Sequence, residues 1–193
     1  MIAGLASEQP VPAGGSAAAA SVAMAAALLE KVASLSGRQW LGATGARERA
    51  TAMREAAGEL VDADAIAYTE FVNARRGGPG LDLEEARALT IEVPMRTVRA
   101  AAETVELAWA LAELGNPNLR SDSLVAGQLA LAGAQAALIT MTANLPDSPR
   151  DARLIEARRL VRSANARLRS TGARGSVGGP GRGRARPAGK RRP

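Results

Sequence analysis

Asp64 is the side chain whose type and surroundings most clearly predict chemistry in this sequence. At helical spacing it shares one apolar stripe with four neighbours, namely Leu60, Val61, Tyr68 and Phe71. A carboxylate in such a stripe must be ion-paired, protonated or turned toward a cavity. Two interpretations follow: Asp64 is the buried partner of an arginine on another helix, or it is an acid/base group in a cleft.

Two further segments carry groups that bind ligands when they stand at a helix start. Asp122 follows Ser121, which we expect to cap a helix, and the helix dipole alone explains an acid at that position. Gly14, Gly15 and Ser16 follow a proline-rich turn, with Ser16 as the expected cap. Their backbone amides form either an ordinary turn or a cradle for an anionic or carbonyl group of a ligand.

The absence of histidine and cysteine restricts the possible reactions. The sequence contains neither residue. Disulfides, thiolate nucleophiles, zinc fingers, Ser-His-Asp triads and histidine-ligated metals are therefore excluded. An enzyme with this sequence must transfer protons through carboxylates, lysine, tyrosine or bound water, and we expect no metal site.

The elements that must position these groups are helices. Hydrophobic residues make up 47% of the 193 residues, alanine is abundant, and aromatic residues reach 2%. Alanine is the best helix former, and so few aromatic residues argue against a sandwich or a barrel. We predict an all-α fold, a compact bundle of about five helices with the third kinked at Pro94. The expected helices span about 17–35, 46–73, 83–114, 121–143 and 150–169.

Two of these helices have distinctive faces. The first is apolar on nearly all sides, which predicts central burial. The fourth carries an apolar stripe that we expect to face the core, made of Val125, Leu129, Ala132, Ala136 and Ile139. The apolar run 17–29 has no basic segment before it, and it is too short to span a bilayer before Glu30 and Lys31. We therefore expect a soluble cytoplasmic protein without a membrane segment.

Charge divides the chain into two parts. Residues 1–149 carry 11 basic and 17 acidic side chains, whereas residues 150–193 carry 14 and 2. We predict a helical domain over 1–170 and a disordered Gly/Arg/Pro-rich tail over 171–193. The tail is either a solubilising extension or a segment that makes weak, nonspecific contact with nucleic acid or another polyanion.

Several short segments, in order along residues 5–145, resemble one family. The sequence is similar to the formiminotransferase-cyclodeaminase and methenyltetrahydrofolate cyclohydrolase family. The matching segments are Leu5-Ala6-Ser7, Pro10 to Ser16, Val61 to Tyr68, Val93-Pro94, Gly115-Asn116, Ser121-Asp122 and Asn144-Leu145.

This resemblance implies a helical, commonly homodimeric enzyme acting on the one-carbon unit between N5 and N10 of tetrahydrofolate. Members either hydrolyse the 5,10-methenyl ring to 10-formyltetrahydrofolate or expel ammonia from 5-formiminotetrahydrofolate. The folate is the substrate, and neither reaction requires a metal or another cofactor. The residues do not distinguish hydrolysis from deamination.

The resemblance also implies site residues. Asp64 would be the main acid/base group and Asp122 a second carboxylate, with Ser121 and Asn116 contacting the pterin or the amidine. Arg38 would receive the anionic glutamate tail of the folate.

Gly14, Gly15 and Ser16 would supply backbone amides on the same interpretation. Two positions depart from the family pattern, because Ala13 replaces a glycine and Thr140 an asparagine. The alternative is therefore a catalytically degenerate helical folate-binding or scaffold protein whose basic tail binds polyanions.

Overall fold

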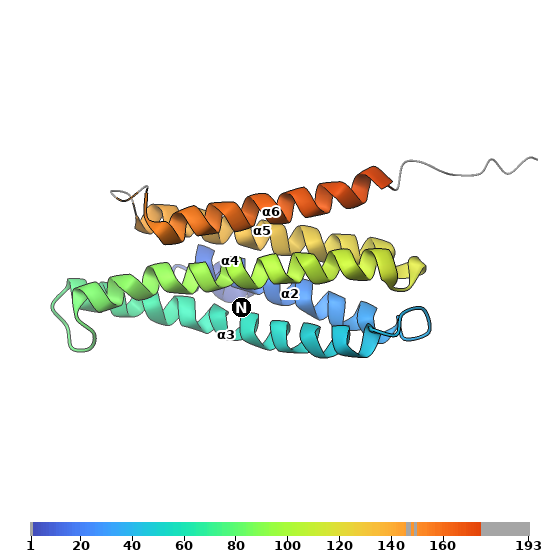
Figure 1. Ribbon diagram of the computed structural model, residues 1–193. Coiled ribbons are helices and arrows are strands. Elements are labelled where there is room, and N and C mark those ends of the chain that lie inside the picture. The colour runs from blue at the N-terminus through green and yellow to red at the C-terminus, as the bar shows by residue number, and fades with distance from the viewer. Residues whose placement is uncertain (1, 146–147, 149, 175–193) are drawn as a thin grey trace, which may run out of the picture.

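The computed structural model describes residues 2–145, 148 and 150–174, and every regular element in that part is a helix (Figure 1). The predicted all-α fold is confirmed, with five long helices at the expected places. The short elements α1 and η1 were not predicted. The predicted tail lies outside the described residues from 175 onward. The elements are α1 (Ile2–Leu5), α2 (Gly14–Ser34), α3 (Ala43–Arg75), α4 (Leu83–Leu114), η1 (Pro117–Leu119), α5 (Arg120–Asn144) and α6 (Ala152–Arg174).

The long helices run up and down beside one another. Helix α2 packs against α3 and α5, α4 packs against the same two helices, and α6 lies over α4 and α5 (Figure 1). The connections 35–42 and 76–82 therefore lie at opposite ends of the bundle. We call these the 35–42 end and the 76–82 end. This arrangement decides which parts of the sequence meet.

Small residues let the helices approach closely. Alanines fill much of the buried surface, together with larger side chains such as Leu29, Leu107 and Leu111. At Gly133 of α5, a Cβ would lie 2.7 Å from Val22 Cγ2 and 2.8 Å from the Ala18 carbonyl oxygen. The contact between α5 and α2 therefore requires glycine at that position.

The apolar stripe predicted for the fourth helix faces the core only in part. Leu129 and Ala136 are partly buried against it, whereas Val125 and Ile139 are 52% and 71% exposed. The buried face of α5 is instead lined mainly by small residues, because close packing against α2 and α4 leaves little room for branched side chains. The buried set is Ser123, Ala126, Gly127, Ala130, Leu131, Gly133, Ala134, Ala137 and Met141.

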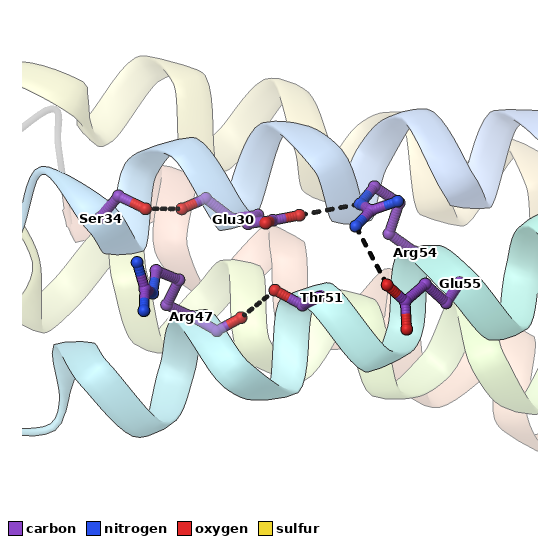
Figure 2. Close-up of polar contacts among 6 residues, drawn as sticks. All are labelled: Glu30, Ser34, Arg47, Thr51, Arg54 and Glu55. Carbon is purple, nitrogen blue, oxygen red and sulfur yellow. Dashed lines mark hydrogen bonds and ion pairs between the residues drawn. The ribbon is translucent and has the colours of Figure 1, made fainter.

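Polar contacts tie α2 to α3 (Figure 2). Arg54 Nε donates to Glu30 Oε2 at 2.8 Å, and the same guanidinium lies 3.3 Å from Glu55 Oε1. The hydrogen bond from Arg54 lowers the pKa of Glu30 below its usual value and raises that of Arg54. Both side chains are partly exposed, so this contact orients the helices more than it stabilises them.

Helix α6 is held on the bundle by ion pairs with α4, in which each helix supplies one arginine and one acid. Arg99 Nε lies 3.2 Å from Glu156 Oε1, and Arg167 Nη2 lies 2.8 Å from Glu106 Oε2. The Arg167 guanidinium also lies over the Trp109 ring, 4.6 Å from its centroid. At least one of the many basic residues of this helix, Arg167, thus serves to dock it.

In the described part of the chain, two segments are long and apolar enough, by length and composition, to cross a membrane: α2 and the segment Pro117–Asn144. Helix α2 is longer than the expected apolar run 17–29, because it continues through Glu30 and Lys31 to Ser34. Within their most apolar windows, 56% and 44% of the residues are buried inside the bundle. Burial of this kind is typical of the core helices of a soluble protein, although much of the second segment is left uncovered.

Candidate functional site

Asp64 of α3 is half-buried and hydrogen-bonded to the first turn of α2. Ser16 Oγ, which is fully buried, donates to Asp64 Oδ2 at 2.9 Å. Ser16 is the third residue of α2 and not its cap as predicted, because Ala13 occupies the cap position without a side-chain bond. Among the described residues, no ion pair to an arginine involves Asp64, which removes the first of the two interpretations.

The carboxylate of Asp64 also lies directly against the backbone of Gly15. A Cβ built on Gly15 would overlap Asp64 Oδ1 and lie 2.5 Å from Asp64 Cγ. Any side chain at position 15 would therefore displace the carboxylate. The glycine in the Gly-Gly-Ser segment thus has a specific steric role in bringing the acid to the helix start.

Asp64 opens into a cleft of about 200 Å³. The cleft draws its walls from the segment before α2 and from α2, α3, α4 and α5, so it depends on the whole four-helix packing. Its lining residues are Val11, Ala13, Gly14, Gly15, Asp64, Ala67, Tyr68, Thr90, Thr140 and Asn144. Both positions that depart from the family pattern, Ala13 and Thr140, are in this lining.

A hydrogen bond in the cleft wall gives Pro94 and Asn144 a shared structural role. Pro94 lies inside α4, which continues through it, and proline has no N–H to bond the carbonyl of Thr90 one turn earlier. Asn144 Nδ2 donates to that carbonyl oxygen at 2.7 Å. The end of α5 is thereby fixed to α4 beside Asp64.

Four of the predicted site residues lie at the other end of the bundle. Arg38 is in the connection between α2 and α3, at the 35–42 end. Asn116 lies against the same connection, donating its N–H to Ser36 Oγ at 2.9 Å and its Nδ2 to the Leu35 carbonyl at 3.3 Å. The 21 residues of α2 separate this end from Ser16 by roughly 30 Å at ~1.5 Å per residue.

Ser121 and Asp122 lie in the first turn of α5, at this same 35–42 end. Ser121 is exposed and is not the cap, since Leu119 occupies that position without a side-chain bond. Within one chain, the structure therefore brings Gly14, Gly15 and Ser16 to Asp64, but not Arg38, Asn116, Ser121 or Asp122.

Two aromatic residues of the predicted apolar stripe lie at the surface beside the cleft. Tyr68 is 46% exposed and Phe71 is half-buried. Tyr68 borders both the Asp64 cleft and a depression of about 660 Å³ that continues to Phe71 and Arg75. Their spacing from Asp64 was visible in the sequence, but an apolar stripe does not reveal whether a neighbouring helix covers it.

Known proteins of one family are similar to this chain in sequence. The family model described as formiminotransferase-cyclodeaminase matches residues 1–161. Methenyltetrahydrofolate cyclohydrolase of Methylorubrum extorquens is 31% identical over 156 residues, covering 73% of this chain and 75% of its own.

A solved structure extends the comparison to the fold. Formiminotetrahydrofolate cyclodeaminase from Thermotoga maritima matches with a TM-score of 0.77 and 25% identity, over 86% of this chain and 90% of that one. The match of the family model includes Gly15, Asp64 and Asn144, the residues around which the cleft is built. By sequence and by architecture, the chain belongs to the formiminotransferase-cyclodeaminase family.

Proposed function

We propose that this protein is a methenyltetrahydrofolate cyclohydrolase in which Asp64 transfers the proton. The observation that carries the proposal is the carboxylate itself, oriented by Ser16 in a cleft of five chain segments. Among the described residues, no hydrogen bond is found to its second oxygen, Oδ1, which leaves that oxygen for a ligand. The likeness to a cyclohydrolase at 31% identity supports hydrolysis.

The proposed reaction adds water to the cationic methenyl carbon. Asp64 takes one proton from the attacking water, and the oxygen forms a tetrahedral carbinol carbon between N5 and N10. The bond from this carbon to N5 then breaks, and its electron pair goes to N5, which receives the proton from Asp64. The carbinol hydroxyl releases its proton to solvent as the formyl C=O forms on N10. One proton is released overall.

Charge and position suit Asp64 to this role. The methenyl substrate is a cation, which a carboxylate in a restricted cleft stabilises. The N–H groups of Gly14 and Gly15 lie in the first turn of α2, where a helix has no internal partner for them. We assign these amides to polar atoms of the pterin. No metal or further cofactor enters the proposed steps.

Deamination is the second candidate, supported by the structural likeness to a cyclodeaminase. In that reaction N10 attacks the carbon of the protonated formimino group, and Asp64 accepts the N10 proton. The same proton then goes to the departing NH2 group, which leaves as ammonia as the methenyl cation forms. The third candidate, folate binding without turnover, is supported by Ala13 and Thr140, which line the cleft where the family has other residues.

A pair of variants on one helix tests the proposal. The full chain is expected to accelerate loss of the methenyl absorbance above the buffer rate, and Asp64→Asn to lower kcat by about 100-fold or more. Asp62→Asn is the matched control, because Asp62 is exposed two residues away. Ammonia release from 5-formiminotetrahydrofolate would favour deamination, and saturable binding without turnover would favour the third candidate. Wild-type turnover by Asp64→Asn would disprove the role of Asp64.

We also propose that the protein is a soluble, cytoplasmic homodimer. The outer faces of α2 and α5 adjoin, since Ser21 Oγ of α2 donates to the Leu129 carbonyl of α5 at 2.8 Å. Exposed Met24, Val125 and Ile139 make these faces apolar. A second copy related by a two-fold axis across the helices would direct its 35–42 end toward the Asp64 cleft. That arrangement would give Asn116, Ser121 and Asp122 a path to substrate.

A further inference from the structure

One side of α3 carries, from Asp64 onward, side chains of three chemical types in succession. Tyr68, Phe71 and Arg75 follow Asp64 at i+4, i+7 and i+11, so the four side chains project from one side of the helix. The span from Asp64 to Arg75 is about 16 Å at ~1.5 Å per residue. The order is therefore acid, two aromatic rings and a cation.

Helices α4 and α5 form the opposite wall along this same path. Thr90 and Asn144 border both the Asp64 cleft and a neighbouring depression of about 320 Å³. That depression is also lined by Phe71, Arg75 and Arg87, with Arg87 one turn before Thr90 on α4. The surface from the acid to the two arginines is therefore continuous.

Among the residues that the structure describes, neither arginine has an acidic partner. No ion pair found in the described part of the chain includes Arg75 or Arg87, although Arg87 is half-buried. Glu84 lines the same depression without bonding to either guanidinium. The depression thus carries a net positive charge from two groups suited to bind carboxylates.

We propose that Arg75 and Arg87 bind the glutamate carboxylates of the folate, with its aminobenzoyl ring against Phe71. This inference rests on the proposed function. The order of these side chains along α3 matches the order of groups in a reduced folate. A reduced folate presents a reactive one-carbon unit, then an aromatic ring, then an anionic tail. It replaces Arg38 as the tail residue, since within the chain Arg38 lies at the far end of the bundle.

The test compares substrates with and without the tail. The Arg75→Gln and Arg87→Gln variants are each expected to raise KM for methenyltetrahydrofolate about tenfold, and more for a polyglutamylated form. Neither should change kcat or the KM for methenyltetrahydropteroate, which lacks glutamate. Arg49→Gln is the matched control, an exposed arginine on the same helix near its other end.

Each outcome separates the inference from the proposed function. An equal rise in KM for both substrates would show a structural effect and overturn the inference, as would unchanged KM values or a rise confined to Arg38→Gln. If the wild-type chain turns over neither compound, the proposed function fails. The inference is then decided by calorimetric binding of 5-formyltetrahydrofolate and 5-formyltetrahydropteroate, for which it requires tighter binding of the former through Arg75 and Arg87.

Discussion

The side-chain amide of Asn144 donates a 2.7 Å hydrogen bond to the backbone carbonyl of Thr90. The carbonyl is free because Pro94, one turn later, has no N–H to offer it. A side chain at the end of α5 thus replaces the backbone hydrogen bond that α4 lacks at Pro94. Both bonded residues, Thr90 and Asn144, line the Asp64 cleft. The three positions form one structural unit, although Asn144 is 54 residues from Thr90 in the sequence.

This unit predicts a double-mutant cycle. Asn144→Ala removes the donor and leaves the Thr90 carbonyl without a protein partner, which should lower the free energy of unfolding by about 1–2 kcal/mol. Pro94→Ala supplies an N–H one turn from Thr90, so Asn144→Ala should cost less in that background. Urea unfolding of the four proteins measures both values. Equal costs in the two backgrounds would show that Asn144 does not act through the carbonyl.

Gly15→Ala should separate activity from stability. The new methyl group would overlap the Asp64 carboxylate, so we expect that group to turn away from the cleft and kcat to fall by at least about tenfold. Gly58→Ala on α3 is the control, because a Cβ there meets no atom within 4 Å. That variant should keep full activity and gain up to about 1 kcal/mol of stability from helix propensity. Turnover assays measure kcat of the two variants, and thermal melts measure their stability. Full activity of Gly15→Ala would contradict the predicted displacement of the carboxylate.

Local sequence predicted the Asp64 site because its determinants are local. Helical spacing placed the acid among apolar neighbours, and the Gly-Gly-Ser segment marked the start of α2. The contact with Ser16 was not predictable in this way, because it joins residues 48 positions apart. It follows from the antiparallel packing of α2 and α3.

The arrangement of the helices in space explains where the structure and the sequence pattern differ. The family pattern groups Arg38 and Asn116 with Asp64, but the order of the helices places both residues at the 35–42 end of the same chain. Tyr68 and Phe71 have the spacing of core residues, yet Tyr68 is exposed and Phe71 is only half-buried. For α5, the larger aliphatic residues predicted the buried face only in part, because helices this close select small side chains instead.

Stability should fall in strong acid through Asp151, just before α6. Hydrogen bonds from the Arg153 side chain hold the pKa of Asp151 at about 2, below its usual 3.8. A lowered carboxyl pKa stabilises the fold above the unfolded value and loses that effect as pH falls from about 4 to 2. Allowing for screening at partly exposed Arg153, we expect about 1–2 kcal/mol.

Asp151→Asn isolates this contribution, since asparagine also caps a helix but carries no charge. Its unfolding free energy should be lower than that of the wild type at pH 7 and equal to it near pH 2. Denaturant titrations across this range measure the difference. A constant difference between the two proteins at every pH would contradict the ion pair as its source.

The apolar face of α2 and α5 predicts the oligomeric state. Ile139 on this face is 71% exposed, and a monomer would leave Met24 and Val125 in water as well. Ile139→Glu adds a charge that costs a lone chain little but must be desolvated in a dimer, so sedimentation equilibrium should show a dimer for the wild type and a monomer for the variant. Ile155→Glu on α6, 53% exposed on a different helix, should remain dimeric.

A monomeric wild type would refute the proposed interface. Loss of assembly with Ile155→Glu alone would move the interface to α6, and activity retained in a monomeric Ile139→Glu protein would show that the Asp64 cleft needs no residue from a second copy.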